Sequence, residues 1–169
     1  MRKLKGLEIS VETETRLVNK LIQKGFHIAC AESCTGGLLC GRIINVPNVS
    51  AVLDCSFVTY ANEAKIKYLG VEEESIAEYG VVSETVAGQM ARGVAAESGA
   101  QVGVATSGIA GPGGGTITKP VGMVCFGFWI DGKLTTSTRY FGNIGRNAVR
   151  EAAVNYALEQ LLELLVENI

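Results

Sequence analysis

A hairpin near the end of the chain is the feature that most constrains its fold. Two β-rich runs, residues 121–130 and 133–141, are separated only by Asp131-Gly132. That dipeptide favours a type I′ turn, which makes the two runs antiparallel neighbours in one sheet. Earlier in the chain, short apolar strands alternate with helical patterns, an order typical of parallel pairing. These earlier strands are predicted at residues 27–31, 55–60 and 102–106.

The chain is therefore predicted to form an α/β fold, a three-layer α/β/α sandwich with a mixed sheet of about five strands. The helices are predicted at residues 10–24, 38–46, 62–70, 72–79, 84–98 and from about 143 towards the C-terminus. Ser10 and Ser83 are suited to cap two of them, and Gly25 is suited to end the first. No internal repeat or linker divides the sequence, so we expect one domain over residues 1–169.

Composition excludes several classes of protein. The net charge is −2 and the sequence pI about 5.5, which gives no electrostatic footprint for nucleic acid as a partner. No apolar run reaches the roughly 18 residues that span a bilayer, so no membrane association is expected. The basic N-terminus lacks the apolar core of a signal peptide. Five cysteines without a CxxC pair favour reduced thiols over disulfides or zinc, and point to a cytoplasmic protein.

The histidine content limits the hydrolytic mechanisms open to this chain. His27 is the single histidine, and it lies within a predicted apolar strand, where a satisfied core or edge residue is expected. A Ser-His-Asp triad would need this residue, and nothing near it resembles a nucleophile elbow. A hydrolase with this sequence therefore needs another general base.

Lysine is the obvious substitute. A lysine desolvated beside a hydroxyl loses its proton near neutral pH and acts as a general base. Ser50, Tyr60 and Lys65 lie around a predicted strand and the start of the next helix, and strand ends are favoured ligand sites in open α/β sheets. On spacing alone, the alternative interpretation, a strand aromatic at Tyr60 and a solvated helix lysine at Lys65, is favoured.

Two glycine-containing turns are candidates for ligand binding. Segment 31–37 stands between a predicted strand and helix, where backbone N–H groups and the helix dipole attract anions. Segment 107–115 holds the densest glycine cluster but is no Rossmann fingerprint, since a strand follows it. An N-cap turn and a surface loop are the structural alternatives. The candidate ligand-binding residues in these turns are Ser33, Thr35, Gly36, Ser107 and Gly108.

Two arginines near the start of the last helix complete the set of candidates. Arg146 and Arg150 are four residues apart and share a helix face. A guanidinium can bind phosphate through two parallel hydrogen bonds. The alternative is a solvated face whose arginines pair with surface carboxylates such as Glu151.

In their order along the chain, these segments resemble the CinA C-terminal domain family, the stand-alone nicotinamide-nucleotide amidases. The resemblance covers nearly the whole chain and rests on several long motifs. They are Ala31-Glu32-Ser33-Cys34-Thr35-Gly36-Gly37, the run from Phe57 to Lys65, Gly80-Val81-Val82-Ser83-Glu84, Ser107-Gly108-Ile109-Ala110-Gly111-Pro112-Gly113-Gly114, Lys119-Pro120-Val121-Gly122, and the final helix with Arg146 and Arg150.

The resemblance implies a fold and an activity. The expected fold is a three-layer α/β/α domain without a metal or organic cofactor. The expected reaction is hydrolysis of nicotinamide mononucleotide to nicotinate mononucleotide and ammonia. In the family pattern the nucleophile is a serine ten residues before the tyrosine, with a lysine five residues after it. Those positions here are Ser50, Tyr60 and Lys65.

Two departures from the family pattern touch this expectation. The segment Pro47-Asn48-Val49-Ser50 replaces the usual Pro-Gly-Ser-Ser, which bears on any oxyanion hole formed there, and Asn143-Ile144-Gly145 alters the approach to Arg146. The resulting hypothesis has Lys65 take the Ser50 proton, directly or through Tyr60. Ser33, Thr35, Gly36 and Arg146 would hold the ribose and phosphate.

Two other functions remain open at this stage. One is a non-enzymatic nucleotide-binding or competence- and damage-related regulatory module, which the altered Asn48-Val49 pair favours. The other is a Ser/Lys amidase for a different phosphorylated substrate. The expected partner is a small-molecule nucleotide substrate, and the apolar last helix favours a homo-oligomer.

Overall fold

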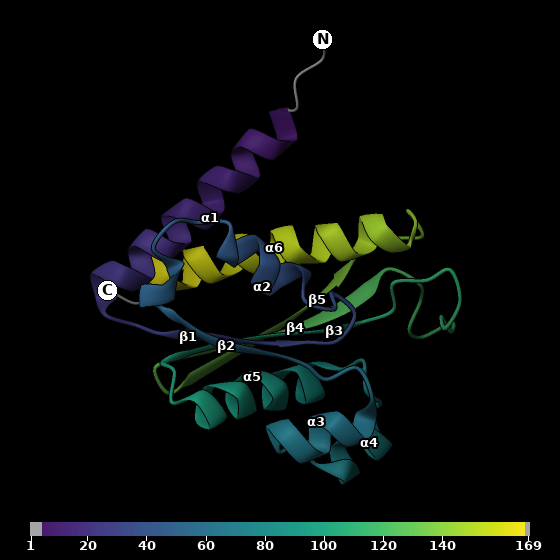
Figure 1. Cartoon of the computed structure of the whole chain (residues 1–169). Coiled ribbons are helices and arrows are strands. Elements are labelled where there is room, and N and C mark those ends of the chain that lie inside the picture. Colours follow the sequence, from purple (N-terminus) through teal and green to yellow (C-terminus); the bar gives the residue numbers. More distant parts are fainter. Residues whose placement is uncertain (1–4, 168–169) are drawn as a thin grey trace.

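The computed structural model describes residues 5–167, with side chains from Thr13 onward, and its centre is a five-stranded sheet (Figure 1). The strand order is β2-β1-β3-β4-β5. Strands β2, β1 and β3 pair in parallel, whereas β4 and β5 are antiparallel to their neighbours. The predicted mixed sheet is confirmed. The strands are β1 (Ile28–Glu32), β2 (Leu53–Val58), β3 (Val102–Gly108), β4 (Met123–Ile130) and β5 (Lys133–Tyr140).

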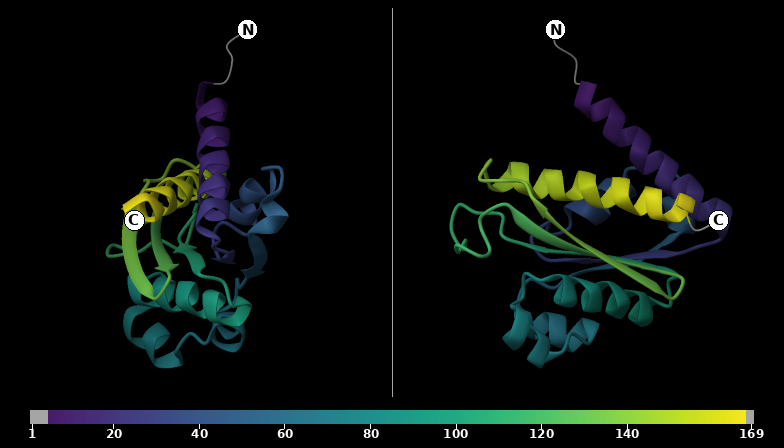
Figure 2. Two further views of the ribbon diagram at one scale, coloured as in Figure 1. Left: turned by 90° about the vertical axis from the view of Figure 1, so that its left-hand side faces the viewer. Right: turned by 180° about the vertical axis from the view of Figure 1, so that it is seen from behind.

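Helices cover both faces of this sheet, which confirms the three-layer prediction (Figure 2). Helices α1, α2 and α6 lie on one face, and α3, α4 and α5 lie on the other (Figure 1). Their bounds are α1 (Lys5–Lys24), α2 (Leu38–Ile44), α3 (Asn62–Leu69), α4 (Glu73–Tyr79), α5 (Glu84–Ser98) and α6 (Arg146–Glu167), and a 3-10 turn, η1 (Val49–Ala51), precedes β2.

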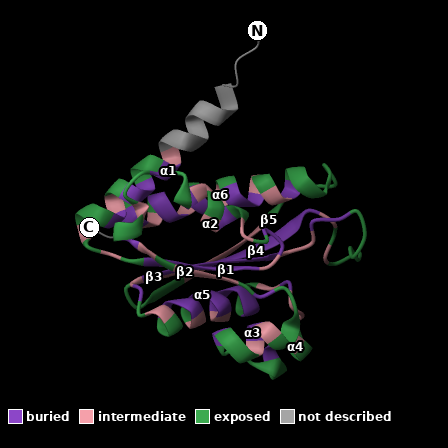
Figure 3. Ribbon diagram, in the orientation of Figure 1, coloured by how far each residue is buried: buried purple, intermediate pink, exposed green. Residues whose placement is uncertain are grey.

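Alternation along β1, which lies between β2 and β3, explains the two apolar cores. Ile28 and Cys30 pack in the core beneath α1, α2 and α6. Ala29 and Ala31 pack in the core beneath α5. Successive side chains of a strand point to opposite faces, so β1 must be apolar on both sides. Figure 3 shows the central strands buried and the outer helix faces exposed.

The hairpin forms as the sequence predicts. Asp131 and Gly132 both have positive φ, at 45° and 92°, which is the backbone of a type I′ turn. Strand β4 is buried along nearly its whole length, whereas β5 is the partly exposed edge strand. A satellite apolar cluster between β4 and α5 adds Val82, Ala87 and Cys125 to the packing.

Some element boundaries differ from the prediction. Helix α1 begins at Lys5, so Ser10 lies inside it rather than capping it, and the Ser10 side chain lies outside the described side chains. Strand β2 ends at Val58, and Tyr60 therefore follows the strand instead of ending it. Helix α6 begins at Arg146 because Gly145, with φ of 102°, cannot continue a right-handed helix towards the N-terminus.

No helix in the described part of the chain is both long enough and apolar enough to cross a membrane. The topology points to a ligand site at the edge of the sheet that the carboxyl ends of β1, β2 and β3 form. From β1 the chain moves to β2 on one side and then crosses to β3 on the other. Such a reversal leaves a crevice beyond the carboxyl ends of the strands, where ligands bind in open α/β sheets. The segments after β1, β2 and β3 meet at this edge.

Candidate active site

A buried lysine is the central feature of this edge. Lys65, in α3, is 0% exposed, although it carries an ionisable amine. Its Nζ lies 3.1 Å from Ser33 Oγ, 2.6 Å from the Thr59 carbonyl oxygen and 3.2 Å from the Tyr60 carbonyl oxygen. Desolvation by this burial lowers the pKa of Lys65 below the ordinary 10.5. No carboxylate forms a salt bridge with it among the described residues.

The three oxygen neighbours accept hydrogen bonds from Lys65, and they can also accommodate its neutral form. A neutral amine has two N–H donors and one lone pair. Carbonyl oxygens only accept, so the Thr59 and Tyr60 carbonyls take the two N–H donors. Lys65 Nζ also donates to Ser33 Oγ, and once the amine is neutral its lone pair would face the Ser33 hydroxyl, which can itself donate. The arrangement fits a Ser/Lys pair in which the lysine is the base.

Glu32 fixes the turn that carries Ser33. Its carboxylate is 0% exposed and accepts hydrogen bonds from the backbone N–H groups of Gly37, Leu39 and Cys40 at 2.9–3.0 Å. It also accepts from the Thr35 hydroxyl at 2.6 Å. The carboxylate thus occupies the N-terminus of α2, where the helix dipole favours negative charge. The Ser33 turn is held from beneath by an internal anion.

This arrangement corrects the expectation of a phosphate cradle at the start of α2. The amides that would bind a phosphate donate to Glu32 instead. The Thr35 hydroxyl is buried between Glu32 and Thr106, and is not available to a ligand. Gly36 has φ of 56°, and a Cβ there would lie 3.3 Å from Arg150 Nη2, so glycine serves the turn and its packing. Ser33 alone of the three faces the lysine.

We expect the substitution Glu32→Gln to lower the free energy of unfolding by about 2–4 kcal/mol, because at least one buried N–H group would face an amide NH2 instead of an oxygen. Urea denaturation followed by circular dichroism measures this change. The matched control is Ser56→Ala, since Ser56 Oγ makes the longest contact to Glu32, 3.5 Å. A Glu32→Gln protein as stable as the Ser56→Ala protein would contradict the structural role.

The two arginines have different places in the site. Arg150 contacts the Ser33 turn, and Arg146 lies on the exposed outer side of the site, called the rim below. Arg150 donates to the carbonyls of Cys34 and Thr35 at 3.0 and 3.1 Å, and so clamps the Ser33 turn to α6. Arg146 is exposed, and donates to the Tyr60 hydroxyl at 3.1 Å and to the Gly111 carbonyl at 2.8 Å. Arg146 therefore joins Tyr60 to the glycine-rich loop. Of the two, Arg146 has the accessible guanidinium.

The end of β3 and the glycine-rich loop that follows it form the other wall of the site, beside the Ser33 turn. Ser107 is buried and its hydroxyl donates to the Val81 carbonyl at 2.8 Å. A Cβ on Gly108 would lie 2.6 Å from Val124 Cγ2, so the strand can only be glycine there. Lys119 Nζ donates to the carbonyls of Val82 and Tyr79, which ties this loop to the α4–α5 connection. Ser107 and Gly108 thus shape the wall through packing and backbone contacts.

The structure does not bring Ser50 to the lysine. Ser50 is exposed in η1, before β2, whereas Lys65 follows that strand. The six residues of β2 separate the two ends of the sheet by about 20 Å. In Figure 1 the start of α6 and the glycine-rich loop lie at one end of the sheet, and the turn before β2 lies at the other. The hypothesis that Lys65 takes the Ser50 proton does not fit this geometry, and the altered Asn48-Val49 pair is equally remote.

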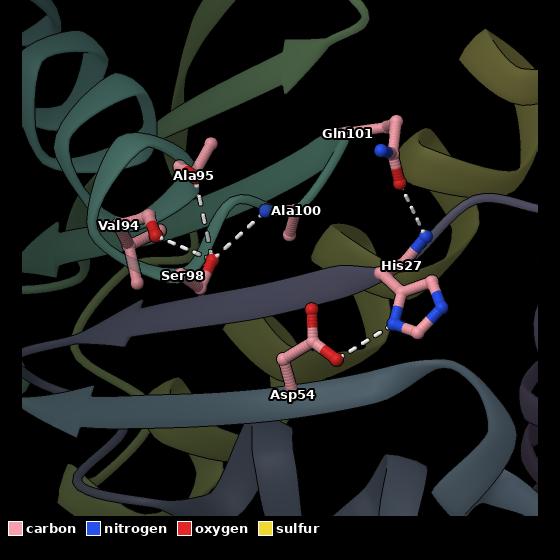
Figure 4. Close-up of polar contacts among 7 residues, drawn as sticks. All are labelled: His27, Asp54, Val94, Ala95, Ser98, Ala100 and Gln101. Atoms are coloured by element: carbon pink, nitrogen blue, oxygen red, sulfur yellow. Dashed lines mark hydrogen bonds and ion pairs between the residues drawn. The ribbon is translucent and has the colours of Figure 1, made fainter.

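The single histidine is at that far end too. His27 precedes β1 instead of lying within it, and its Nδ1 is 2.6 Å from Asp54 Oδ1 (Figure 4). The side chain is 47% exposed and paired with Asp54, so of the two expected positions, core or edge, it has the edge one. The nearby Ser98 hydroxyl donates to the Val94 and Ala95 carbonyls at the end of α5 (Figure 4). No hydrogen bond between Ser98 and His27 is found in this described region.

Comparison with known proteins agrees with the motifs around this edge. The family model for the CinA C-terminal domain matches residues 10–165, which include Ser33, Tyr60, Lys65 and Arg146. The chain belongs to the CinA C-terminal domain family. It is 46% identical over 146 residues to a competence-damage inducible protein of Clostridium tetani, covering 86% of this chain and 36% of the relative. It is 50% identical over 140 residues to a competence-damage inducible protein of Clostridium acetobutylicum, covering 82% of this chain and 34% of the relative.

The CinA relationship extends to solved structures. The competence/damage inducible protein CihA from Agrobacterium tumefaciens superposes with a TM-score of 0.90 at 41% identity, covering 97% of this chain and 99% of that one. A CinA superfamily protein from Escherichia coli has a TM-score of 0.90 at 34% identity, with 96% and 94% covered. This chain spans about a third of the length of the two curated clostridial relatives.

Sequence reasoning missed three residues that this CinA-type edge depends on. Glu32 ends a buried apolar strand directly before the Ser33 turn, and a carboxylate at that place in a strand-turn-helix segment is the signal that would have found it. Thr59 was treated only as a strand residue, although its carbonyl holds Lys65. The role of Lys119 had no local signal, because its partners lie about 40 residues away.

Proposed function

We propose that this chain hydrolyses the carboxamide of nicotinamide mononucleotide to nicotinate mononucleotide and ammonia, with Ser33 as nucleophile and Lys65 as general base. The observation that carries the proposal is the Ser33–Lys65 pair at 3.1 Å, in which Lys65 is fully buried and also donates to two carbonyl oxygens. The resemblance to nicotinamide-nucleotide amidases supplies the substrate. Assigning Ser33 in place of Ser50 as the nucleophile keeps the predicted Ser/Lys chemistry.

Acylation begins with transfer of the Ser33 hydroxyl proton to the Lys65 amine. The Ser33 oxygen then attacks the carboxamide carbon, and the positive pyridinium ring favours this attack by withdrawing electrons from the amide. The C–N bond breaks as the nitrogen takes the proton back from Lys65. Ammonia leaves, and an ester joins the nicotinyl group to Ser33. General acid–base catalysis of this kind contributes about 10²–10⁴-fold.

The tetrahedral oxyanion needs hydrogen-bond donors near Ser33. Within the described residues, the backbone N–H groups of Cys34 and Thr35 donate to no oxygen of another residue. They are the first amides after the nucleophile, and Arg150 holds their carbonyls in place. We assign them as the oxyanion donors, each worth about 3–4 kcal/mol when well placed.

We assign the ribose and phosphate of the substrate to the rim of the site, where Arg146 and Tyr60 lie. Arg146 presents an exposed guanidinium next to the Tyr60 hydroxyl, which gives a fixed cation for the phosphate. Tyr60 is 63% exposed, and its hydroxyl accepts a hydrogen bond from Arg146. All five cysteines are free thiols, which suits a reaction in the cytoplasm. Formation of a homo-oligomer stays a prediction.

The proposal is tested by ammonia release from the purified protein. We expect release from nicotinamide mononucleotide, and at least about tenfold less at equal concentration from nicotinamide riboside, because Arg146 would lose its phosphate partner. Nicotinamide, which lacks both ribose and phosphate, is the second control. A coupled glutamate dehydrogenase assay measures the ammonia.

The other outcomes separate the alternatives. Equal release from the mononucleotide and the riboside would contradict phosphate recognition at the rim. Release from other phosphorylated amides alone would indicate an amidase with a different substrate. Binding of the mononucleotide without release would overturn the catalytic proposal, and would favour a regulatory nucleotide-binding module.

A further inference from the structure

A second hydroxyl next to Ser33 has no role in the mechanism above. We infer that Thr59 is a further catalytic residue, whose hydroxyl contacts the departing ammonia and then holds the water that hydrolyses the Ser33 ester. This inference rests on the proposed function. It is carried by the burial of Thr59, by its missing hydrogen-bond partner and by its place in the sheet.

The Thr59 hydroxyl is the exceptional polar group of this edge. Thr59 is 2% exposed, and its Oγ1 is buried without a hydrogen-bond partner among the residues that the structure describes. Buried side-chain oxygens are nearly always paired, and an unpaired one costs about 1–3 kcal/mol. By contrast, the backbone of Thr59 is fully used, since its N–H donates to Glu32 and its carbonyl accepts from Lys65.

The register of the parallel strands places this hydroxyl beside the nucleophile. Glu32 pairs with Val58 on one side and with Thr106 on the other. The Thr59 N–H donates to Glu32 O, and the Ser33 N–H donates to Thr106 O, so both ladders continue for one more residue. Ser33 is thus flanked by Thr59, the first residue after β2, and by Ser107 on β3. In-register neighbours point to the same face and lie about 4.8 Å apart.

The two flanking hydroxyls differ in their bonding. Ser107 Oγ donates its proton to the Val81 carbonyl at 2.8 Å, and so has a structural partner. Thr59 Oγ1 has none within the described chain, and it lies on the side from which Lys65 reaches Ser33. Thr59 and Ser33 are in-register neighbours, so their backbones lie about one strand spacing apart. That spacing is the reach needed to contact a nitrogen or oxygen atom bonded to the carbon that Ser33 attacks.

The chemistry of the second half-reaction needs a group at this place. Water replaces ammonia on the same side of the ester, because both must exchange a proton with Lys65. One water proton passes to Lys65 Nζ, the water oxygen bonds to the acyl carbon, and the C–O bond to Ser33 breaks as Ser33 takes that proton. The other hydrogen of the water forms a hydrogen bond to Thr59 Oγ1, and this bond orients the attacking lone pair.

The test compares Thr59→Val with Thr59→Ser. Valine keeps the shape and removes the hydroxyl, and serine keeps the hydroxyl. We expect Thr59→Val to lower steady-state ammonia release about 10–100-fold. We expect Thr59→Ser to stay within about threefold of the parent. Because ester hydrolysis is the slowed step, Thr59→Val should show a burst of about one ammonia per site. The quenched protein should carry the added mass of the acyl group on Ser33.

Stability supplies the readout that a structural role would not give. Since valine removes a buried unpaired oxygen, we expect the thermal midpoint of Thr59→Val to equal or exceed that of the parent. A lower midpoint with equally slow Thr59→Ser would show a packing role and overturn the inference. Normal turnover of Thr59→Val without a burst would overturn this inference and leave the proposed function standing. A parent protein that releases no ammonia would overturn the proposed function and this inference with it.

Discussion

Ser33→Ala is expected to abolish ammonia release, with a loss of at least about 10³-fold in kcat, because the attacking oxygen is removed. Ser50→Ala is expected to stay within about twofold of the parent, since Ser50 is exposed in η1 at the far end of β2. The two substitutions remove the same hydroxyl group. They therefore differ only in which end of the sheet loses it.

The measurement needs a check on folding and on binding. Ser33→Ala removes one contact to Lys65, so its circular dichroism spectrum should be unchanged and its thermal midpoint close to that of the parent. Isothermal titration should show that nicotinamide mononucleotide still binds, because Arg146 and Tyr60 are intact. If Ser50→Ala were the inactive protein and Ser33→Ala the active one, the assignment from geometry would be wrong.

The layered fold could be predicted from local patterns because each pattern has a local physical cause. The hairpin depends on Asp131-Gly132, whose two positive φ angles are set by the turn itself. The alternation of apolar strands with helices requires parallel pairing whatever the details. Boundaries were less accurate, as at β2, where the strand ends at Val58 so that the next two carbonyls can turn towards Lys65.

The site was predicted in part, and the reason is the topology. Lys65, Tyr60 and Arg146 were identified as site candidates, and they do lie at one edge. The choice of Ser50 followed the family pattern, a serine ten residues before the tyrosine, but a strand carries the chain from one end of the sheet to the other. Ser33 is 32 residues from Lys65 in sequence, and it lies next to it because β1 and β2 are parallel neighbours. Pairing of that kind is not visible in spacing.

The segment 31–37 shows the same limit. Hydroxyls and glycines before a helix are typical of an anion-binding turn, and this turn does bind an anion. The anion is the side chain of Glu32, from the same segment. A sequence pattern indicates that the amides need a negative partner, but it does not say whether that partner is a ligand or a residue. Burial of Glu32 decides the question here.

Lys65→Met is the second substitution with a large expected effect. Methionine retains the length and apolar stem of lysine but cannot accept a proton, so ammonia release should fall about 10²–10⁴-fold. In the parent, kcat/KM should rise with pH through the free-enzyme pKa of Lys65, because the neutral amine is the active form. That pKa lies below 10.5 owing to desolvation. The matched control is Lys67→Met, an exposed lysine of the same helix, which should retain its activity and its pH profile.

The same lysine should make stability depend on pH with a definite sign. Burial lowers the Lys65 pKa in the folded protein, whereas the unfolded chain retains the ordinary value of 10.5. Between these two pKa values the unfolded chain binds more protons, so the free energy of unfolding gains a contribution that increases with pH. Lys65→Met lacks this contribution. Urea unfolding should therefore show the parent gaining stability relative to Lys65→Met as the pH rises from neutral towards 10.5, while its difference from Lys67→Met stays constant. A parent that gained nothing on Lys65→Met over that range would mean that Lys65 remains an ordinary ammonium in the folded protein, and Ser33 would then have no base.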